Sequence, residues 1–437
     1  MNNNSINNKL ILYINLILTV CLVYISKYIQ IQSYTSFLFI YAIVQLVYFI
    51  IFFYKSPVIV VILIFILTYF IYLIPHFFFQ EYYFSSNRIF QSSYTISLNL
   101  KLLIVFNTFC FTALGKKIEI YKLSLEKKFN RKNAPVIVYI LSIIIIFFCG
   151  LIVYEAGGTI LTGGYSDTTT VGRSGFVDYS LFIIPIMFYF DKKGSQKKYI
   201  LFIGILYIIV NFLFGYRLRS MQMMFALYCL YYSMKISTKK VIAICLFAIV
   251  IFAWLGSIRA GNTFSLFQVI GNFNGKDTII SNQGGVWQSS IIYISLIEYG
   301  YLDWIGRIKM LLGNIIAIVI PSTQMSPNWS IQQFVRQYVN IPGGGFASAY
   351  LYVYGGWVGV GLGGWLIGSI MSIPYREIKR QGVMLYSSLI LIVTFRWYSY
   401  SLINFFKMGF WMLLLFWVCN LMYYSIANRS CDLKKLI

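Results

Sequence analysis

Long apolar runs alternate with short polar segments along almost the whole chain. A helix that crosses the hydrocarbon layer of a membrane needs about 20 predominantly apolar residues, and many of the runs approach this length. The pattern predicts an all-α polytopic membrane protein in which residues 1–437 form a single transmembrane domain of about twelve helices. The expected helices lie near residues 10–26, 34–54, 57–79, 96–115, 135–154, 177–190, 199–215, 219–234, 241–257, 347–372, 382–395 and 408–425.

One long segment departs from this alternation. Residues 258–346 lie between a predicted outgoing helix and a predicted incoming helix, so we expect a long external loop before the tenth helix. Within the loop, residues 311–320 are apolar, but Pro321 ends the run after only ten residues. A run of this length is too short to span the membrane and is typical of a re-entrant or interfacial segment.

The composition excludes a soluble domain, because 59% of the 437 residues are hydrophobic and only 11% are charged. The first apolar run, residues 10–24, follows Lys9 directly and is not followed by a signal-peptide cleavage site. We therefore expect it to be retained as a helix. The seven cysteines fall in predicted helices or predicted cytoplasmic segments, so we expect no disulfide, no metal site and no cofactor.

The net charge of +23 invites comparison with nucleic-acid-binding proteins, but the positions of the charges argue against such a partner. Basic residues sit between the apolar runs, where they set the orientation of a membrane protein by favouring the cytoplasmic side. If the N-terminus is cytoplasmic, every predicted cytoplasmic segment is basic, and both termini lie inside. These segments hold 22 of the 35 Lys and Arg residues. The 22 are Lys9, Lys55 and the basic residues within 116–132, 192–198, 235–240, 376–380 and 429–435.

Lysine and arginine are distributed differently over the two sides of this topology. Only four of the 22 internal cations are arginine. An excess of arginine outside suggests planar, bidentate recognition of phosphate or carboxylate, although contact between interfacial side chains and lipid headgroups is a simpler explanation. Eight of the 13 external cations are arginine: Arg88, Arg173, Arg217, Arg219, Arg259, Arg307, Arg336 and Arg396.

The segment Gly215-Tyr216-Arg217-Leu218-Arg219-Ser220 joins two predicted helices on the external side. The second helix runs inward, so its unpaired N–H groups and the positive end of its dipole face this segment. An anion bound here would meet two guanidinium groups and a helix N-terminus together. The alternative is a tight glycine turn with two arginines that reach toward the membrane surface.

A second motif closes the long loop, with the sequence Asn340-Ile341-Pro342-Gly343-Gly344-Gly345-Phe346-Ala347-Ser348. Three glycines before an inward helix permit a close backbone approach and an anion-binding nest, and Ser348 is placed to cap or line that entrance. The alternative is a flexible loop followed by small residues that pack helices together, among them Gly355, Gly359, Gly361 and Gly363.

These motifs, in this order and on this topology, resemble the Wzy-type polymerases that join oligosaccharide repeat units in O-antigen and capsule synthesis. The resemblance rests on the Gly215–Arg217 turn before an inward helix, the long external loop late in the chain, and its glycine-rich end "PGGGFASAYLYVYGGWVGVG". It covers the whole chain as architecture and implies a GT-C-like fold. The sequence departs from the family where many members carry a glutamate after the glycine loop, because Ala349-Tyr350-Leu351 stands there instead.

The resemblance implies glycosyl transfer on the outer face of a bacterial plasma membrane. A hydroxyl of a new lipid-linked repeat unit would attack the anomeric carbon of the growing glycan, and polyprenyl pyrophosphate would leave. A chain-length regulator and a flippase are the partners this implies. Cations must stabilise the leaving pyrophosphate: Arg217 and Arg219 are the first candidates, and Arg259, Arg336 and Arg396 are the next. Gly343, Gly344, Gly345 and Ser348 form the candidate glycine loop.

A base for the attacking hydroxyl is the other requirement of this chemistry. Asp277 and Glu298 rank first because both lie in the long loop. The sole histidine, His76, is expected at the outer end of a helix beside Pro75, where an interfacial role is more common. The predicted external acids are Glu81, Glu155, Asp167, Asp178, Asp277, Glu298 and Asp303.

Two other functions fit a protein of this class. A flippase for lipid-linked oligosaccharides would have a similar number of helices, but it should show two similar halves, and the sequence shows none. An O-antigen ligase shares the architecture and the late loop. It would be expected to carry a histidine in that loop, and this loop contains no histidine.

Overall fold

The fold is almost entirely helical in the computed structural model, which describes residues 3–25, 31–71, 92–118, 123, 125, 129–155, 175–214, 216–259, 282–320, 324–339, 341, 343–376 and 380–435. Its only β-type pairing among these residues is an isolated bridge between Asn133 and Asp191. Each of the twelve predicted helical regions overlaps a helix of the structure. The all-α class expected from the apolar runs is therefore confirmed.

The first half of the chain forms α1 (Asn3–Ile25), α2 (Ile31–Phe52), α3 (Pro57–Ile71), α5 (Ser93–Lys117), α7 (Pro135–Glu155), the 3-10 helix η3 (Gly175–Tyr179), α8 (Ser180–Tyr189), α9 (Lys197–Leu213), α10 (Arg217–Leu227), the π-helical turn η4 (Tyr228–Tyr232) and α11 (Thr238–Arg259). The second half forms α13 (Asn282–Glu298), α14 (Trp304–Ile316), η8 (Pro327–Trp329), α15 (Ile331–Arg336), α16 (Ala347–Met371), η9 (Ile373–Tyr375), α17 (Gln381–Ile392), α18 (Thr394–Trp397) and α19 (Ile403–Lys435).

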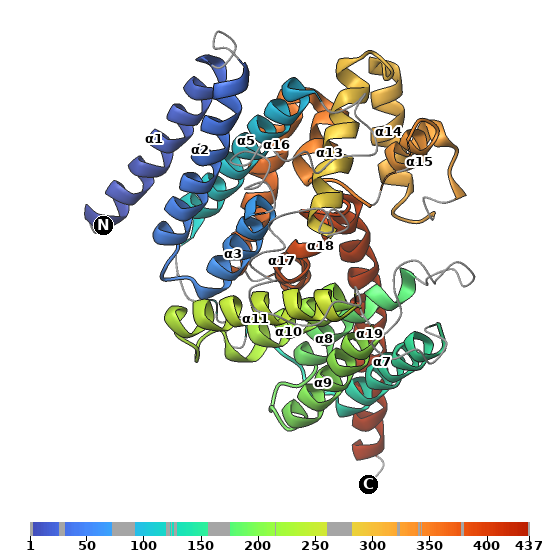
Figure 1. The fold of residues 1–437 in the computed structure, drawn as a ribbon. Coiled ribbons are helices and arrows are strands. Elements are labelled where there is room, and N and C mark those ends of the chain that lie inside the picture. Colours follow the sequence, from blue (N-terminus) through green and yellow to red (C-terminus); the bar gives the residue numbers. More distant parts are fainter. Residues whose placement is uncertain are drawn as a thin grey trace.

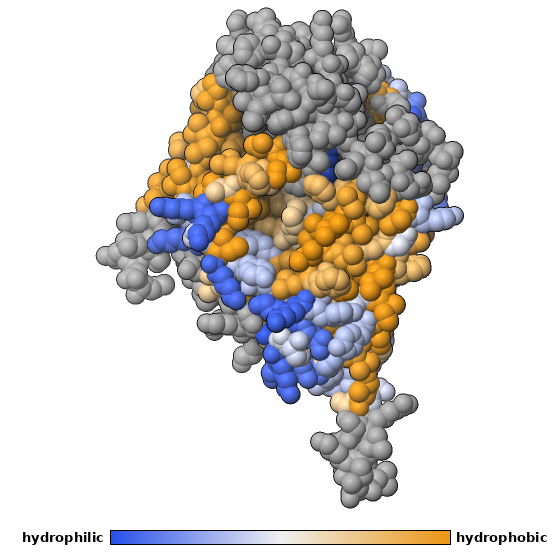
Figure 2. Space-filling model, turned by 60° about the horizontal axis from the view of Figure 1, so that its bottom comes forward, coloured by the Kyte–Doolittle hydropathy of each residue, from blue (hydrophilic) through white to orange (hydrophobic). Residues whose placement is uncertain are grey.

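Five segments within the described helices are long and apolar enough to cross a membrane: Thr35–Phe52, Ser93–Lys116, Pro135–Tyr154, Ala347–Tyr375 and Ile403–Ala427. Four further apolar helices are shorter, at Leu10–Ile25, Pro57–Phe70, Val177–Tyr189 and Gln381–Ile392. The chain is thus a multi-pass membrane protein. Figure 2 agrees with this, because apolar residues cover much of the coloured part of the face that it shows, and the largest hydrophilic patches lie at its left and bottom.

The helices form two groups (Figure 1). In one group, α1, α2 and α16 pack against α5, and α13 packs against α16. In the other, α7 and α10 pack on α9, and α8 contacts α7, α10 and α19. Helix α17 joins the groups through contacts with α16, α8 and α19, so a residue on α17 or α18 can meet residues from both halves of the chain.

Small residues let α16 approach α5 closely, as the glycine-rich sequence suggested. A Cβ atom at Gly364 would lie 2.9 Å from the carbonyl oxygen of Phe106, and one at Gly368 would lie 1.9 Å from that of Cys110. Those two glycines, rather than the four expected, make the closest approach to α5. Gly361 makes only an ordinary contact with Phe109.

Helix α16 is broken near its middle. Gly356 has φ 60° and ψ −151°, a backbone conformation that residues with a side chain rarely adopt. The break divides α16 into a first part that faces α13 and α14 and a second part that lies along α5.

The segment that we expected as a long external loop contains helices of its own. Helix α13 is buried through most of its length, with Trp287 and Tyr293 fully enclosed. Its hydroxyl residues weaken the apolar pattern in the sequence, but Ser290 and Ser295 donate hydrogen bonds to carbonyl oxygens four residues earlier. These two hydroxyl groups are thus satisfied within the helix, and Ser289 donates to the carbonyl oxygen of Gly343, which together allow burial.

Candidate functional site

One carboxylate forms ion pairs with two arginine side chains in the part of the chain that the structure describes. Asp178 lies in η3, Arg219 in α10 and Arg396 in α18. Arg219 Nε donates to Asp178 Oδ1 at 2.6 Å, and Arg396 Nη2 donates to Asp178 Oδ2. The side chains of Arg219, Asp178 and Arg396 are 7%, 12% and 26% exposed, respectively. We call these three residues the ion cluster.

Local hydrogen bonds hold the elements of the ion cluster in place. Directly after α9, the N–H of Tyr216 donates a hydrogen bond to the carbonyl oxygen of Asn211 at 2.7 Å. Ser220 Oγ then ties α10 to α9 by donating to Ile208 O at 3.0 Å. On the other side, Tyr207 of α9 donates from its hydroxyl to Val177 O of η3 at 3.3 Å. The aromatic ring of Tyr216 lies against the guanidinium of Arg219, with 4.4 Å from Cζ to the ring centroid.

The ion cluster carries more positive than negative charge, because a single carboxylate faces two guanidinium groups. Charges that lie away from water are costly unless they are paired. One cation here is balanced by Asp178, and the second remains as an excess in a mostly buried position. Such a site favours an additional anion, and its field is stronger than the same charge would produce in water.

The other arginines predicted to bind pyrophosphate lie at helix ends. Arg217 is the first residue of α10 and is half-buried, two residues from Arg219. Arg336 is the last residue of α15 and is exposed. Arg259 is the last residue of α11, and its side chain lies outside the described residues, as do Gly215, His76 and Asp277. The structure thus brings together Arg219 and Arg396, two of the five candidates.

The glycine loop packs tightly against two other elements. A Cβ atom at Gly344 would lie 1.4 Å from the carbonyl oxygen of Tyr400, and one at Gly345 would lie within 3.0 Å of both Tyr293 and Ser290. Close backbone approach therefore explains why these positions are glycine. Tyr400 follows Arg396 by one helical turn, so the loop and the ion cluster share the segment after α18.

The entrance of α16 is capped by its neighbours rather than by Ser348. The N-cap residue is Phe346, whose N–H donates to Ser290 Oγ at 2.7 Å, and the N–H of Ala347 donates to Tyr398 O at 2.8 Å. The capping hydrogen bond considered for Ser348 is not formed, because these groups already satisfy the first N–H donors. Ser348 Oγ is buried and has no hydrogen-bond partner among the described residues.

Tyr350 connects the glycine loop with α13 and α15. Its hydroxyl accepts from Gln332 Nε2 at 3.0 Å, donates to Tyr400 O at 3.2 Å and lies 3.5 Å from the hydroxyl of Tyr293. Four segments that are distant in the sequence meet at this one oxygen. Tyr350 therefore joins α13, α15 and the segment after α18 by polar contacts as well as by packing.

Glu298, a candidate base, ends α13 and is half-buried. Its Oε1 accepts from the hydroxyl of Tyr352 at 2.6 Å, and its Oε2 accepts from the hydroxyl of Tyr94 at 2.8 Å. A carboxylate can accept about four hydrogen bonds, so each oxygen retains acceptor capacity. Tyr352 lies in the glycine-rich sequence that carries the family resemblance, whereas no sequence signal marked Tyr94 as a partner of Glu298. We call Glu298, Tyr352 and Tyr94 the hydroxyl cluster.

Arg307, one of the eight arginines predicted to be external, forms hydrogen bonds with α16 next to the break at Gly356. Its Nε and Nη2 donate to the carbonyl oxygens of Val353 and Tyr352, each at 2.7 Å. The break at Gly356 leaves carbonyls near it without helical partners, and the guanidinium provides donors for two of them. Trp304 lies against the same guanidinium at 4.0 Å. Burial lowers the pKa of Arg307, and the neighbouring Tyr352 and Glu298 oppose this effect.

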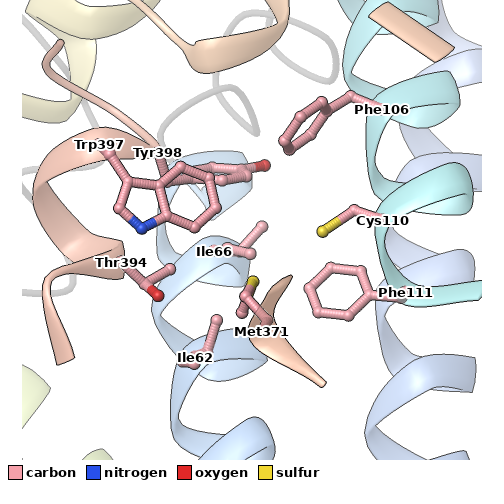
Figure 3. Close-up of a pocket in the computed structure, with 9 residues that line it drawn as sticks. All are labelled: Ile62, Ile66, Phe106, Cys110, Phe111, Met371, Thr394, Trp397 and Tyr398. Atoms are coloured by element: carbon pink, nitrogen blue, oxygen red, sulfur yellow. The ribbon is translucent and has the colours of Figure 1, made fainter. Parts of the chain in front are cut away.

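An apolar space elsewhere in the fold offers no comparable chemistry (Figure 3). Thr394 and Tyr398 are two of its polar lining residues, and both are already bonded: Thr394 donates to Ile390 O, and the hydroxyl of Tyr398 donates to Asn107 Oδ1. The space leaves no room for a water molecule, so it is a packing gap. It is lined by Ile62, Ile66, Phe106, Cys110, Phe111, Met371, Thr394, Trp397 and Tyr398.

Comparison with known proteins identifies one family. The family model described as "Putative O-antigen polymerase" matches residues 70–299, which is more than half of the 437-residue chain. No curated protein and no solved structure matches significantly. The matched region contains Asp178, Arg217, Arg219 and Glu298, whereas Arg396 and the glycine loop lie beyond it.

Proposed function

The chain belongs to the O-antigen polymerase family, and from this premise we propose that it polymerises lipid-linked oligosaccharide repeat units into surface polysaccharide. The reaction takes place on the outer face of a bacterial plasma membrane. Both substrates carry a polyprenyl pyrophosphate anchor, which accounts for an active site within a membrane domain. The observation that carries the proposal is the ion cluster, in which an excess guanidinium lies mostly buried within a polymerase-family chain.

The proposed reaction is a glycosyl transfer. A hydroxyl oxygen of the incoming repeat unit attacks the anomeric carbon of the growing glycan and forms the new glycosidic bond. The bond from that carbon to the pyrophosphate oxygen breaks, and the electron pair leaves with polyprenyl pyrophosphate. The hydroxyl proton passes to a base. The products are the glycan extended by one unit on the incoming lipid and a free polyprenyl pyrophosphate.

Arg219 and Arg396 act on the leaving group in this proposal. Negative charge accumulates on the pyrophosphate as its bond to the sugar breaks, and cations fixed beforehand stabilise that charge without rearranging. Arg217, at the first position of α10, adds a third guanidinium beside the helix N-terminus. Asp178 keeps the two buried arginines together, so they need not repel each other when the site is empty.

Glu298 is the proposed base for the attacking hydroxyl. Tyr94 and Tyr352 fix its two oxygens by neutral hydrogen bonds, whereas the neighbouring Arg307 donates its hydrogen bonds to backbone carbonyls. Tyr350 links Tyr293 of α13, the helix that Glu298 ends, to the carbonyl oxygen of Tyr400, which lies four residues after Arg396. We propose that the anomeric carbon of the growing glycan lies between the two clusters, with its pyrophosphate at the ion cluster and the attacking hydroxyl on the side of Glu298.

Deleting the gene tests the proposed function. The deletion strain should accumulate lipid carriers that bear single repeat units and should lose long surface polymer, as measured by mass spectrometry of extracted lipids and by gel laddering of polysaccharide. Restoring the wild-type gene on a plasmid is the control. Persistence of long polymer in a strain without a paralogue would show that the chain is no polymerase. Free polymer that is made but not attached to its final acceptor would identify a ligase instead.

A further inference from the structure

A buried carboxamide lies one turn of helix from Arg219. Gln222 is fully buried, with 0% of its surface exposed. Neither its Nε2 nor its Oε1 has a hydrogen-bond partner among the described residues. An amide in this state has lost its hydrogen bonds to water without gaining others, which costs free energy. The position therefore needs an explanation that packing alone does not supply.

The direction of Gln222 follows from its neighbours on α10. Residues three apart lie on the same face of a helix. Arg219, three residues before Gln222, is bonded to Asp178, which also binds Arg396 of α18. Phe225, three residues after it, lies against Phe395 of α18, with ring centroids 5.0 Å apart. Gln222 thus lies along α10 between two residues that approach α18.

Arg219 has an unpartnered N–H donor close to that of Gln222 along α10. Its Nη1 is buried and has no hydrogen-bond partner among the described residues. The Nε–H and the Nη1 hydrogens of a planar guanidinium point in different directions. Asp178 occupies the Nε–H, so the Nη1 hydrogens remain available. Two buried side chains one turn apart on α10, Arg219 and Gln222, therefore both offer N–H donors without an acceptor.

We propose that Gln222 is a further ligand of the lipid-linked substrate, at the junction between its pyrophosphate and its first sugar; this inference rests on the proposed function. Phosphate oxygens accept from Arg219 Nη1 and Gln222 Nε2, and a hydroxyl of the sugar donates to Gln222 Oε1. A glycosyl phosphate presents acceptors and a donor side by side, as this pair requires. Inorganic pyrophosphate satisfies only the donors.

Binding to the purified full-length protein in lipid nanodiscs tests the inference. Two probes are used: inorganic pyrophosphate, and the lipid-linked repeat unit extracted from the deletion strain. Gln222→Met replaces the amide by an apolar side chain of similar length. We expect this variant to keep the wild-type thermal midpoint, because no formed hydrogen bond is lost. We also expect it to bind inorganic pyrophosphate at least threefold more weakly and the lipid-linked unit at least tenfold more weakly.

Asn99 provides the matched control. It is a carboxamide on α5, also 0% exposed and also without a partner for either amide atom among the described residues. Asn99→Leu should leave the affinities for both probes unchanged. Gln222→Glu is the second variant at the site: it keeps the shape but adds negative charge, and it should abolish binding of both probes.

The outcomes separate the inference from the proposed function. Wild-type affinities in Gln222→Met and Gln222→Glu, together with lost binding in Arg219→Ala, would overturn the role of Gln222 and leave the ion cluster as the pyrophosphate site. Equal weakening by Asn99→Leu would also overturn it, because the effect would then be general to buried amides. Unchanged binding in Arg219→Ala would overturn the proposed pyrophosphate site itself.

Discussion

The ion cluster and the hydroxyl cluster hold their charged groups in opposite ways. In the ion cluster, Asp178 is paired with two arginines, so the carboxylate is more than neutralised and cationic charge remains. In the hydroxyl cluster, Glu298 receives two neutral tyrosine hydroxyls. The nearby Arg307 donates instead to backbone carbonyls of α16.

The contrast shows that the chemical role of a carboxylate depends on the groups that bond to it, more than on its charge alone. A carboxylate held by two guanidinium groups is a poor proton acceptor, and its role is to organise cations. A carboxylate held by neutral donors keeps its charge and its remaining lone pairs, and it can receive a proton from a substrate. We therefore propose anion binding for the ion cluster and base chemistry for the hydroxyl cluster. The variants that follow challenge this division, in order of expected effect.

The largest effect is expected at Glu298. Glu298→Gln keeps the side-chain shape and removes the proton acceptor, so polymerisation should fall by about 100-fold to 10,000-fold. The measurement is the rate of polymer formation from the extracted lipid-linked unit. Asp303→Asn is the matched control, because Asp303 is a nearby acid whose carboxylate caps α14 by accepting from Gly306 N at 2.7 Å. Equal rates of polymer formation in both variants would show that Glu298 is not the base.

Arg217 tests the cationic side of the comparison. A charge-assisted hydrogen bond contributes about 1.5–3 kcal/mol, so Arg217→Ala should reduce polymerisation by about 10-fold to 100-fold. Arg217→Lys keeps the charge but loses the bidentate fork, and it should be nearly as defective. The readout is polymer laddering in cells at matched membrane abundance. Wild-type ladders from both variants would leave Arg217 as a residue that anchors the helix at the membrane surface.

A smaller effect is expected from the backbone that supports the hydroxyl cluster. Gly356→Ala forces a side chain into a conformation that glycine adopts at φ 60° and ψ −151°, at a cost of about 1–3 kcal/mol of stability. We expect a lower thermal midpoint in detergent. Gly355→Ala is the control, because a Cβ there would meet nothing within 4 Å and its φ is not in the left-handed region. Similar midpoints for the two variants would mean that the break carries no such strain.

Much of the helical framework could be predicted from apolar spacing, and so could the start of α10 near Arg217. Helix α13 was missed as a helix because its serines and Gln288 interrupt the apolar run, and only the structure shows that Ser290 and Ser295 form intrahelical hydrogen bonds. Asp178 could be identified as an acid but not as the partner of both arginines, since it lies 41 and 218 positions from them. Nothing local encodes a contact across such separations.

The order in which the ion cluster emerges during synthesis has a consequence for assembly. A chain that folds as it is made acquires its N-terminal helices first. Asp178 and Arg219 are only 41 positions apart, so their ion pair can form before the second half of the chain is made. Arg396 comes 218 positions after Asp178 and completes the cluster late. The second guanidinium therefore joins Asp178 only when the chain is nearly finished, so the excess positive charge of the ion cluster is a property of the complete fold.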